Sequence, residues 1–377
     1  MVASSSQLAD LLRSRRVVVC VGAGGVGKTT VSASLGVGAA SLGLRALVLT
    51  VDPARRLANA LGLDDIRQDI QHIAASELQA IGVDTEVGLD VAMLDVQSTF
   101  DRVVTRLAPN PKSAEAILNN PFYRHGSSAL AGSQEYMAMA RLSEVVTETD
   151  YDLIVLDTPP SAHALDFLEA PQRMIDLFGS SAFRVLLRTM TAKGGGIGMF
   201  RPSGLVMRGL SRFTSTDSFS SLLAFFALLS TTFDGFIRTA EDVMKLLRSS
   251  QTAFIIVSAC DHVSTQEGHY LRDRLRQERM TVGAWVLNRV LLSAASETES
   301  VTCPDGWTQA QLNAVLAARD AMVGLSQRDR EHLAALRGLV GETLPVQWLS
   351  RRPNEPAQLS ELNALATTLL APPRGLV

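Results

Sequence analysis

The segment Gly22-Ala23-Gly24-Gly25-Val26-Gly27-Lys28-Thr29 is the feature that most constrains the fold. It follows the pattern G-x-x-x-x-G-K-[ST], comes directly after an apolar run at 16–21, and precedes a stretch at 29–40 with helical character. This order of strand, glycine-rich turn and helix is typical of a phosphate-binding loop. The alternative is an ordinary tight turn, but a turn gives no packing reason for the Gly-Lys-Thr ending.

Phosphate chemistry predicts a role for each part of this loop. The glycines let the backbone turn sharply and direct its N–H groups toward phosphate oxygens at the start of the helix. We expect Lys28 to reach the β- and γ-phosphates as a catalytic cation, and the Thr29 hydroxyl to ligate Mg²⁺. The predicted nucleotide-binding residues of this segment are Gly22, Gly24, Gly25, Val26, Gly27, Lys28, Thr29 and Thr30.

Short apolar runs rich in Val, Ile and Leu recur along the chain, with helical segments between them. Because these runs are continuous rather than alternating, they predict strands buried on both faces, and so a doubly wound, mostly parallel α/β sheet. Besides 16–21, the predicted strands lie at 46–51, 91–94, 153–156, 254–257 and 284–287. Ligands of such sheets bind beyond the carboxyl ends of the strands.

Three polar residues directly follow predicted strands, so we expect them beside the phosphate loop. Asp52 is predicted to act in catalysis or metal binding, with a helix cap as the alternative. Asp157 is predicted to be the second carboxylate on the Mg²⁺ side. Asn288, followed by Arg289, carries an amide suited to the edge of a base, although an Asn after a strand also occurs as a turn residue.

The strand pattern is interrupted by residues 95–145 and 167–250, which we predict to form an inserted α-helical subdomain facing a client, a partner or the membrane. Apolar residues recur there at near-helical spacing, a pattern that packing into a core accounts for most simply. The P-loop nucleotide-binding core is then predicted at 1–94, 146–166 and 251–377.

One part of the predicted insertion has an unusual composition. Residues 177–216 contain no Asp or Glu, and their Arg and Lys residues are interleaved with Met and Gly. This combination suits contact with an acidic partner, anionic lipid or an apolar client helix. A solvated loop is the alternative.

Overall composition excludes some classes of function. A net charge of −3 and 19% charged residues among 377 give no basic field, so nucleic acid is not an expected partner. The three cysteines, Cys20, Cys260 and Cys303, form no Cys-x-x-Cys pair and are expected to be reduced thiols. The N-terminus lacks a secretory pattern and no apolar run is long enough to span a bilayer, so we expect a cytoplasmic protein, peripheral at most to a membrane.

The motifs resemble a family of dimeric P-loop ATPases that includes the arsenite-pump ATPase subunit and the factors that target tail-anchored membrane proteins. The resemblance spans most of the chain and looks closest to the actinobacterial branch, in which two unlike paralogues pair. The residues that carry it are Gly22 to Thr30, Asp52-Pro53-Ala54, Asp157-Thr158-Pro159-Pro160 with His163, and Asn288-Arg289.

The resemblance implies an Mg²⁺-dependent ATP hydrolase that binds ATP and ADP as a nucleotide-switched dimer. It implies that Asp52 belongs to the first switch, where it positions the attacking water at the metal side. Thr29 and Asp157 would hold Mg²⁺.

The resemblance also implies roles for residues farther along the chain. His163 would report the γ-phosphate state to the helical subdomain from the second switch. Asn288 and Arg289 would lie at the adenine, and Pro345 with the loop through Pro356 would close over the base.

The chain departs from the family pattern in three places. Arg55 and Arg56 follow the first-switch motif where the family usually has His and a small polar residue, and the paired cysteines that bind zinc between targeting-factor subunits are absent. Ala23 replaces the lysine that normally crosses the dimer interface to the other subunit's phosphates.

The loss of that lysine predicts a heterodimer, because a cation supplied from a second subunit strongly stabilises the transferring phosphoryl group. A paralogue with the intact lysine would complete this site. The alternative is a poorly hydrolysing nucleotide-binding scaffold or regulatory subunit. Phosphoryl transfer to a small molecule is a third possibility, for which the sequence offers no substrate-pocket motif, and no cysteine cluster suggests an arsenite site.

Overall fold

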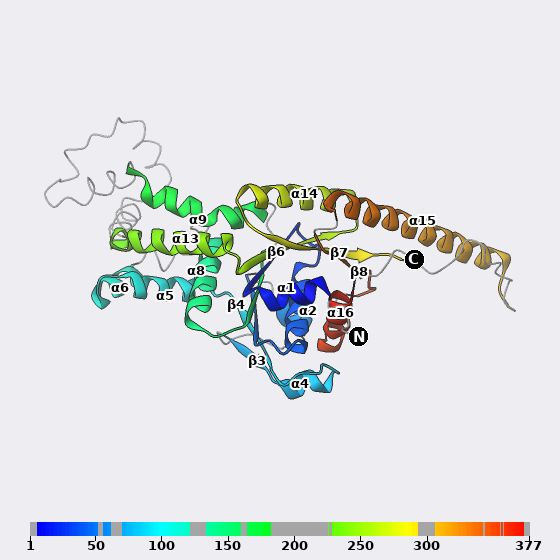
Figure 1. Cartoon of the computed structure of the whole chain (residues 1–377), viewed down its shortest axis with the longest axis horizontal. Helices are drawn as coiled ribbons and strands as arrows, with labels where there is room; N and C mark the ends of the chain where they lie inside the picture. Colours follow the sequence, from blue (N-terminus) through cyan, green and yellow to red (C-terminus); the bar gives the residue numbers. More distant parts are fainter. Residues whose placement is uncertain are drawn as a thin grey trace. The chain divides into compact units, whose positions relative to one another are not determined.

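A computed structural model shows a mostly parallel sheet flanked by helices, and a second group of helices (Figure 1). Two compact units are formed: Met1–Met93, Asp150–Ala164 and Arg248–Val377 make unit 1, and Leu94–Thr149 with Leu165–Leu247 make unit 2. The structure describes residues 6–51, 56–61, 70–120, 133–159, 164–181, 225, 228–292, 306–341, 344–354, 356 and 358–372.

Unit 1 contains the sheet, and within the described residues its strand order is β3-β4-β2-β5-β1-β6-β7-β8. Neighbouring strands are parallel except β3 and β4, which are antiparallel. The predicted mostly parallel α/β sheet is therefore confirmed. The strands are β1 (Val17–Val21), β2 (Ala46–Thr50), β3 (Gln71–Ile73), β4 (Leu89–Met93), β5 (Leu153–Asp157), β6 (Thr252–Ala259), β7 (Val282–Val290) and β8 (Val346–Ser350).

The central strands are buried on both faces, as their continuous apolar sequences require. Every residue of β1, β2 and β5 is buried. Helix α2 packs closely on one face, where a Cβ on Gly36 would collide with Val48. Helix α14 packs closely on the other, where a Cβ on Gly268 would collide with Trp285.

Strand register aligns the polar strand ends that the sequence places near the phosphate loop. Asp157 lies beside Cys20 of β1 on one side and beside Thr50 of β2 on the other. Asn288 of β7 lies beside Ala259 of β6. The carboxyl ends of β2, β5, β1, β6 and β7 therefore lie at one edge of the sheet, the edge at which β1 leads into the turn before α2.

Helices of unit 1 cover both faces of the sheet (Figure 1). The longest, α15, begins with a capping box in which Thr308 and Gln311 exchange hydrogen bonds. Among the helices of the described residues, none combines the length and hydropathy needed to cross a membrane. The helices of unit 1 are α1 (Gln7–Ser14), α2 (Lys28–Ser41), α3 (Arg56–Leu61), α4 (Ala75–Ala80), α14 (His262–Gln277), α15 (Gln309–Val340) and α16 (Leu359–Leu370).

Unit 2 is helical throughout the residues that the structure describes, and aromatic side chains form its core. The Phe236 ring lies near those of Phe100, Tyr136 and Phe178. The Tyr136 hydroxyl donates to the carbonyl of Phe236 at 2.9 Å, and burial raises the pKa of this phenol well above its usual range. The helices are α5 (Val96–Leu107), α6 (Pro111–Leu118), α8 (Ser133–Glu148), α9 (Ala164–Gly179), η2 (Ser230–Thr232) and α13 (Phe233–Arg248).

Removing a large side chain from the centre of the sheet tests this packing. Phe254 is fully buried on β6, so Phe254→Ala should lower the free energy of unfolding by about 3–5 kcal/mol through lost burial and a residual cavity. Chemical denaturation followed by circular dichroism measures the change. The matched aromatic control is Tyr270→Ala, whose side chain is 62% exposed; it should shift stability by no more than about 0.5 kcal/mol. Equal effects of the two variants would contradict the packing described.

Candidate nucleotide site

The turn between β1 and α2 has a backbone that requires glycine at several positions. Gly25 and Gly27 have φ angles of 75° and 95°, in the left-handed region that favours glycine. A Cβ on Gly22 would collide with the carbonyl oxygen of Val257, so the loop lies directly against β6. Gly24 and Gly25 are exposed, whereas Val26 is buried. The loop is therefore anchored at its ends and open at its tip.

Lys28 is the first residue of α2 and its side chain is buried inside the curve of the loop. Its ammonium donates to the carbonyl oxygens of Gly22 and Ala23, at 2.9 and 2.8 Å. A cation and the N–H groups of a helix N-terminus thus lie together, with Thr29 and Thr30 in the first turn. This combination is suited to a phosphate group.

The carboxylate of Asp157, at the end of β5, is completely buried. A buried carboxylate is costly unless hydrogen bonds satisfy it, and three hydroxyl groups from α2 and β2 donate to this one. Thr29 and Thr50 donate to Oδ2 at 2.7 and 2.9 Å, and Ser32 donates to Oδ1 at 3.4 Å. The predicted Mg²⁺ ligands Thr29 and Asp157 are therefore in direct contact.

Asn288 lies on β7 with its side chain directed at the loop. Its amide donates to the carbonyl of Val26 at 2.9 Å and accepts from the backbone N–H of Arg289 at 2.9 Å. A Cβ on Gly27 would collide with this amide, so strand and loop are in tight contact. Arg289 itself has a φ angle of 61°, an uncommon conformation for a residue with a side chain. Asn288 thus braces the phosphate loop.

Among the described residues, Pro345 is a predicted site residue that does not lie at the phosphate loop. Pro345 precedes β8, and its carbonyl accepts from the N–H of Trp285 at 2.8 Å. Trp285 is three strand residues before Asn288, or about 10 Å toward the amino end. Pro345 therefore lies at the amino end of β8, away from the phosphate loop. Asp52 and His163 lie outside the described residues, as does most of 177–216.

The thiol of Cys20, which lies beside Asp157 in the sheet, is unreactive. Cys20 is fully buried on β1, and burial, with a further contribution from the charge of Asp157, raises the pKa of its thiol to about 12. The Cys20 carbonyl accepts from the hydroxyl of Thr158 at 2.7 Å, so this residue supports the strand end that carries Asp157. Near neutral pH it is a protonated structural side chain.

Three residues that hold the site were not predicted from the sequence. Thr50 and Ser32 position the Asp157 carboxylate, and Thr158 joins β5 to β1. Thr50 and Ser32 belong to no predicted motif, and Thr158 was named only as part of the motif that begins at Asp157, so these contacts follow from strand register and helix placement. The Thr50-to-Asp157 pairing of β2 and β5 is the signal that reveals it.

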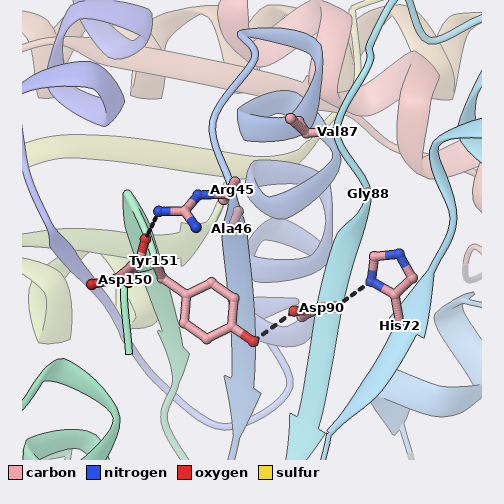
Figure 2. Close-up of a pocket in the computed structure, with 8 residues that line it drawn as sticks. All are labelled: Arg45, Ala46, His72, Val87, Gly88, Asp90, Asp150 and Tyr151. Atoms are coloured by element: carbon pink, nitrogen blue, oxygen red, sulfur yellow. Dashed lines mark hydrogen bonds and ion pairs between the residues drawn. The ribbon is translucent and has the colours of Figure 1, made fainter. Parts of the chain in front are cut away.

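A pocket of about 460 Å³ lies at the other end of the sheet, by the amino ends of β2 and β4 (Figure 2). In it, Asp90 receives hydrogen bonds on both carboxylate oxygens: the imidazole Nδ1 of His72 lies 2.6 Å from Oδ1, and the Tyr151 hydroxyl donates to Oδ2 at 2.6 Å. The Arg45 guanidinium donates to the Asp150 carbonyl. None of the predicted nucleotide-binding residues lines this pocket.

Comparison with known proteins identifies the family of this chain. A sequence model of the anion-transporting ATPase family matches residues 15–320, which is most of the chain. The chain belongs to this family. It is therefore an ATP-hydrolysing P-loop enzyme, as the sequence motifs predict.

Individual relatives cover different shares of the chain. ATPase GET3 of Malassezia globosa is 25% identical over 281 residues, 74% of each chain. ATPase ASNA1 homolog 1 of Paramecium tetraurelia is 32% identical over 153 residues, 41% of this chain and 43% of its own. A protein of Aquifex aeolicus named as a candidate arsenical pump-driving ATPase is 24% identical over 165 residues, 42% of this chain and 39% of its own. The last two alignments thus span less than half of those relatives.

The brace between Asn288 and the loop predicts a measurable effect. Asn288→Ala removes one hydrogen bond to Val26, worth about 0.5–1.5 kcal/mol, so nucleotide affinity measured by calorimetry should fall about two- to tenfold. Because the brace acts on the loop, the fold loss should be the same for ATP and GTP, whereas a base contact would weaken ATP alone.

Asn363→Ala is the matched control, because the Asn363 amide donates to a different loop carbonyl, that of Ile81. It should leave nucleotide affinity unchanged. Wild-type affinity in Asn288→Ala would contradict the bracing role.

Proposed function

We propose that this chain is an Mg²⁺-dependent ATPase in which the state of the nucleotide at unit 1 moves unit 2. The observation that carries the proposal is the contact between Thr29 and the buried carboxylate of Asp157, beside the ammonium of Lys28. A hydroxyl, a carboxylate and a lysine at the end of a glycine-rich loop are the groups that manage a metal–nucleotide complex.

The donor atoms fit Mg²⁺. Magnesium prefers hard oxygen ligands, usually one or two carboxylates together with phosphate oxygens and water, and the side chains of Thr29 and Asp157 supply oxygen donors at one point. Bound there with ATP, the ion would neutralise charge on the phosphates. Thr29 can keep its hydrogen bond to Asp157 while a lone pair of its oxygen faces the ion. Asp52 is the third proposed metal-side residue.

The protein's own groups account for phosphate binding. With nucleotide bound, Lys28 would exchange its carbonyl partners for phosphate oxygens, and the backbone N–H groups of residues 24–29 would donate to the same phosphates. Asn288 holds the loop in shape through its hydrogen bond to Val26. Asp52 positions the attacking water. The family resemblance supports this last role.

Chain connectivity supports coupling between the units. The carboxyl end of β4, Met93, is the last residue of the first segment of unit 1, and unit 2 begins at Leu94. Seven residues after Asp157, the chain reaches Ala164, and unit 2 resumes at Leu165. Two strand ends at the nucleotide edge therefore lead directly into the helical unit. We propose that the segment containing His163 transmits the phosphate state along this connection.

We further propose that the working unit is a pair of unlike subunits. Ala23 is partly buried against the core and offers no charge to a neighbouring site. A paralogue carrying lysine at this position would supply the missing cation to the site of this chain. Unit 2, including the basic residues of 177–216, would contact an apolar client, a membrane-associated protein or a membrane surface.

Ala23 also favours a second candidate function, a scaffold that binds nucleotide and hydrolyses it slowly. Asp52→Asn separates the two. Multiple turnovers that this substitution abolishes support the ATPase, whereas tight nucleotide binding with no turnover in the wild type supports the scaffold.

The metal-side carboxylate makes the proposal testable. Asp157→Asn keeps the shape of the side chain and removes its charge, so Mg²⁺-dependent ATP turnover should fall by on the order of 10²-fold. Asp90→Asn, on β4 at the other end of the sheet, is the matched control and should retain wild-type turnover. A steady-state phosphate-release assay at saturating Mg²⁺ measures both. Full turnover in Asp157→Asn would overturn the assignment.

Restoring the missing cation tests the pairing proposal. Ala23 has no positive φ angle, so lysine is compatible with the backbone there. Ala23→Lys should raise the turnover of the chain on its own by at least about tenfold, since a cation supplied between subunits can contribute far more. The gain should depend on protein concentration, because it requires a dimer. Ala23→Gln, equally long and uncharged, should give no gain, and an unchanged rate in Ala23→Lys would count against the proposal.

A further inference from the structure

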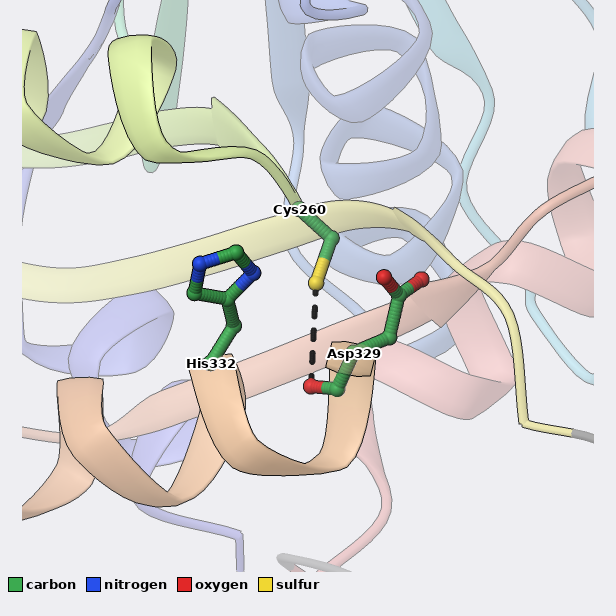
Figure 3. Close-up of side chains that lie close together, drawn as sticks. All are labelled: Cys260, Asp329 and His332. Carbon is green, nitrogen blue, oxygen red and sulfur yellow. Dashed lines mark hydrogen bonds between the residues drawn. The ribbon is translucent and has the colours of Figure 1, made fainter. Parts of the chain in front are cut away.

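A cluster of three possible metal ligands lies in unit 1, outside the proposed magnesium site (Figure 3). Cys260 directly follows β6, while Asp329 and His332 lie on one face of α15, three residues apart. One ligand atom from each residue lies within 4.8 Å of the other two. The sequence separates Cys260 from Asp329 by 69 positions, so only the fold brings them together.

The three side chains offer the donor types that zinc uses in proteins. Thiolate sulfur, imidazole nitrogen and carboxylate oxygen bind Zn²⁺ at about 2.0–2.3 Å, which places tetrahedral ligand atoms about 3.5 Å apart. The atoms of this cluster therefore need to approach by little more than about 1 Å, within the reach of side-chain rotation. Three protein ligands leave a fourth position for water.

His332 carries the strongest indication of a missing partner. Its Nδ1 atom is buried and has no hydrogen-bond partner among the described residues. Buried polar atoms are normally satisfied, and an unpaired one is destabilising. The labelled ring lies beside the thiol of Cys260 (Figure 3). An ion between them would give this nitrogen its partner.

The carboxylate of Asp329 is already held in position. It is 3% exposed, its Oδ2 accepts from the backbone N–H of Leu291 at 2.9 Å, and its Oδ1 accepts from the Arg328 guanidinium at 3.1 Å. Such partners orient a metal-binding carboxylate, and each oxygen keeps a further lone pair. By contrast, the Cys260 thiol makes a long contact of 3.7 Å to the Asp329 carbonyl. That weak contact costs little to replace.

We propose that Cys260, Asp329 and His332 bind one divalent transition-metal ion of the zinc class. On binding, the thiol proton leaves to solvent and a metal–sulfur bond replaces the sulfur–hydrogen bond. Leu291 directly follows β7, so the ion would fasten α15 to the carboxyl ends of β6 and β7. These strands also carry Val257 and Asn288, which contact the phosphate loop. None of the three proposed ligands belongs to the nucleotide site, so metal binding here does not depend on the proposed ATPase activity.

Cobalt titration tests the proposal without nucleotide or Mg²⁺. The full chain, freed of metal by a chelator that is then removed, is titrated with Co²⁺ and afterwards with Zn²⁺. We expect one equivalent of Co²⁺ to produce the visible absorption of tetrahedral cobalt and a thiolate-to-cobalt charge-transfer band. One equivalent of Zn²⁺ should abolish both bands. A wild-type chain without these bands would overturn the proposal.

Variants assign the ligands. Cys260→Ser should lose the charge-transfer band, and His332→Gln should weaken binding by at least about tenfold. Cys303→Ser and His72→Gln, the matched controls, should bind as the wild type does. The metal-free variants should unfold at the temperature of the metal-free wild type and lack only its Zn²⁺-induced rise. Wild-type affinity in His332→Gln, a charge-transfer band that persists in Cys260→Ser, or loss of binding in the controls would overturn the assignment.

Discussion

The buried carboxylate of Asp157 is the constraint on which the nucleotide site depends. A charge removed from water must be satisfied by the protein, and here hydroxyl groups of Thr29 and Ser32 on α2 and of Thr50 on β2 converge on it. These hydrogen bonds hold the first turns of α2 against β5 and β2. They therefore determine where α2 begins, at the end of the phosphate loop. Positioning of Lys28 and its neighbours follows from that attachment.

Most of the fold could be predicted, because strands buried on both faces leave a pattern that does not depend on partners. Continuous apolar runs such as Val17–Val21 and Leu153–Asp157 are typical of strands in the middle of a parallel sheet. Two strands did not show this pattern. β3 has three residues and lies at an edge of the sheet, and β8 contains the polar residue Gln347, so neither forms a continuous apolar run. Pairing with β4 and β7 determines them instead.

The site was predictable only where its residues form a motif or end a strand. The loop and Asp157 meet that condition, whereas Thr50 and Ser32 depend on register and helix placement. Asn288 illustrates an intermediate case: its position after an apolar run indicated the site, but its hydrogen bond to Val26 is a property of the folded loop. The cluster of Cys260, Asp329 and His332 could not be predicted from the sequence. No motif spacing links Cys260, after β6, to two residues on a helix about 70 positions later.

A crystal structure with Mg²⁺ and a non-hydrolysable ATP analogue tests the central claim most directly. The account predicts that the ion lies at the side chains of Thr29 and Asp157, and that the Lys28 ammonium exchanges at least one of its bonds to Gly22 and Ala23 for a phosphate oxygen. The Asn288 bond to Val26 should persist. A bound nucleotide whose ion lies away from Asp157, with Lys28 still on both carbonyls, would contradict the account.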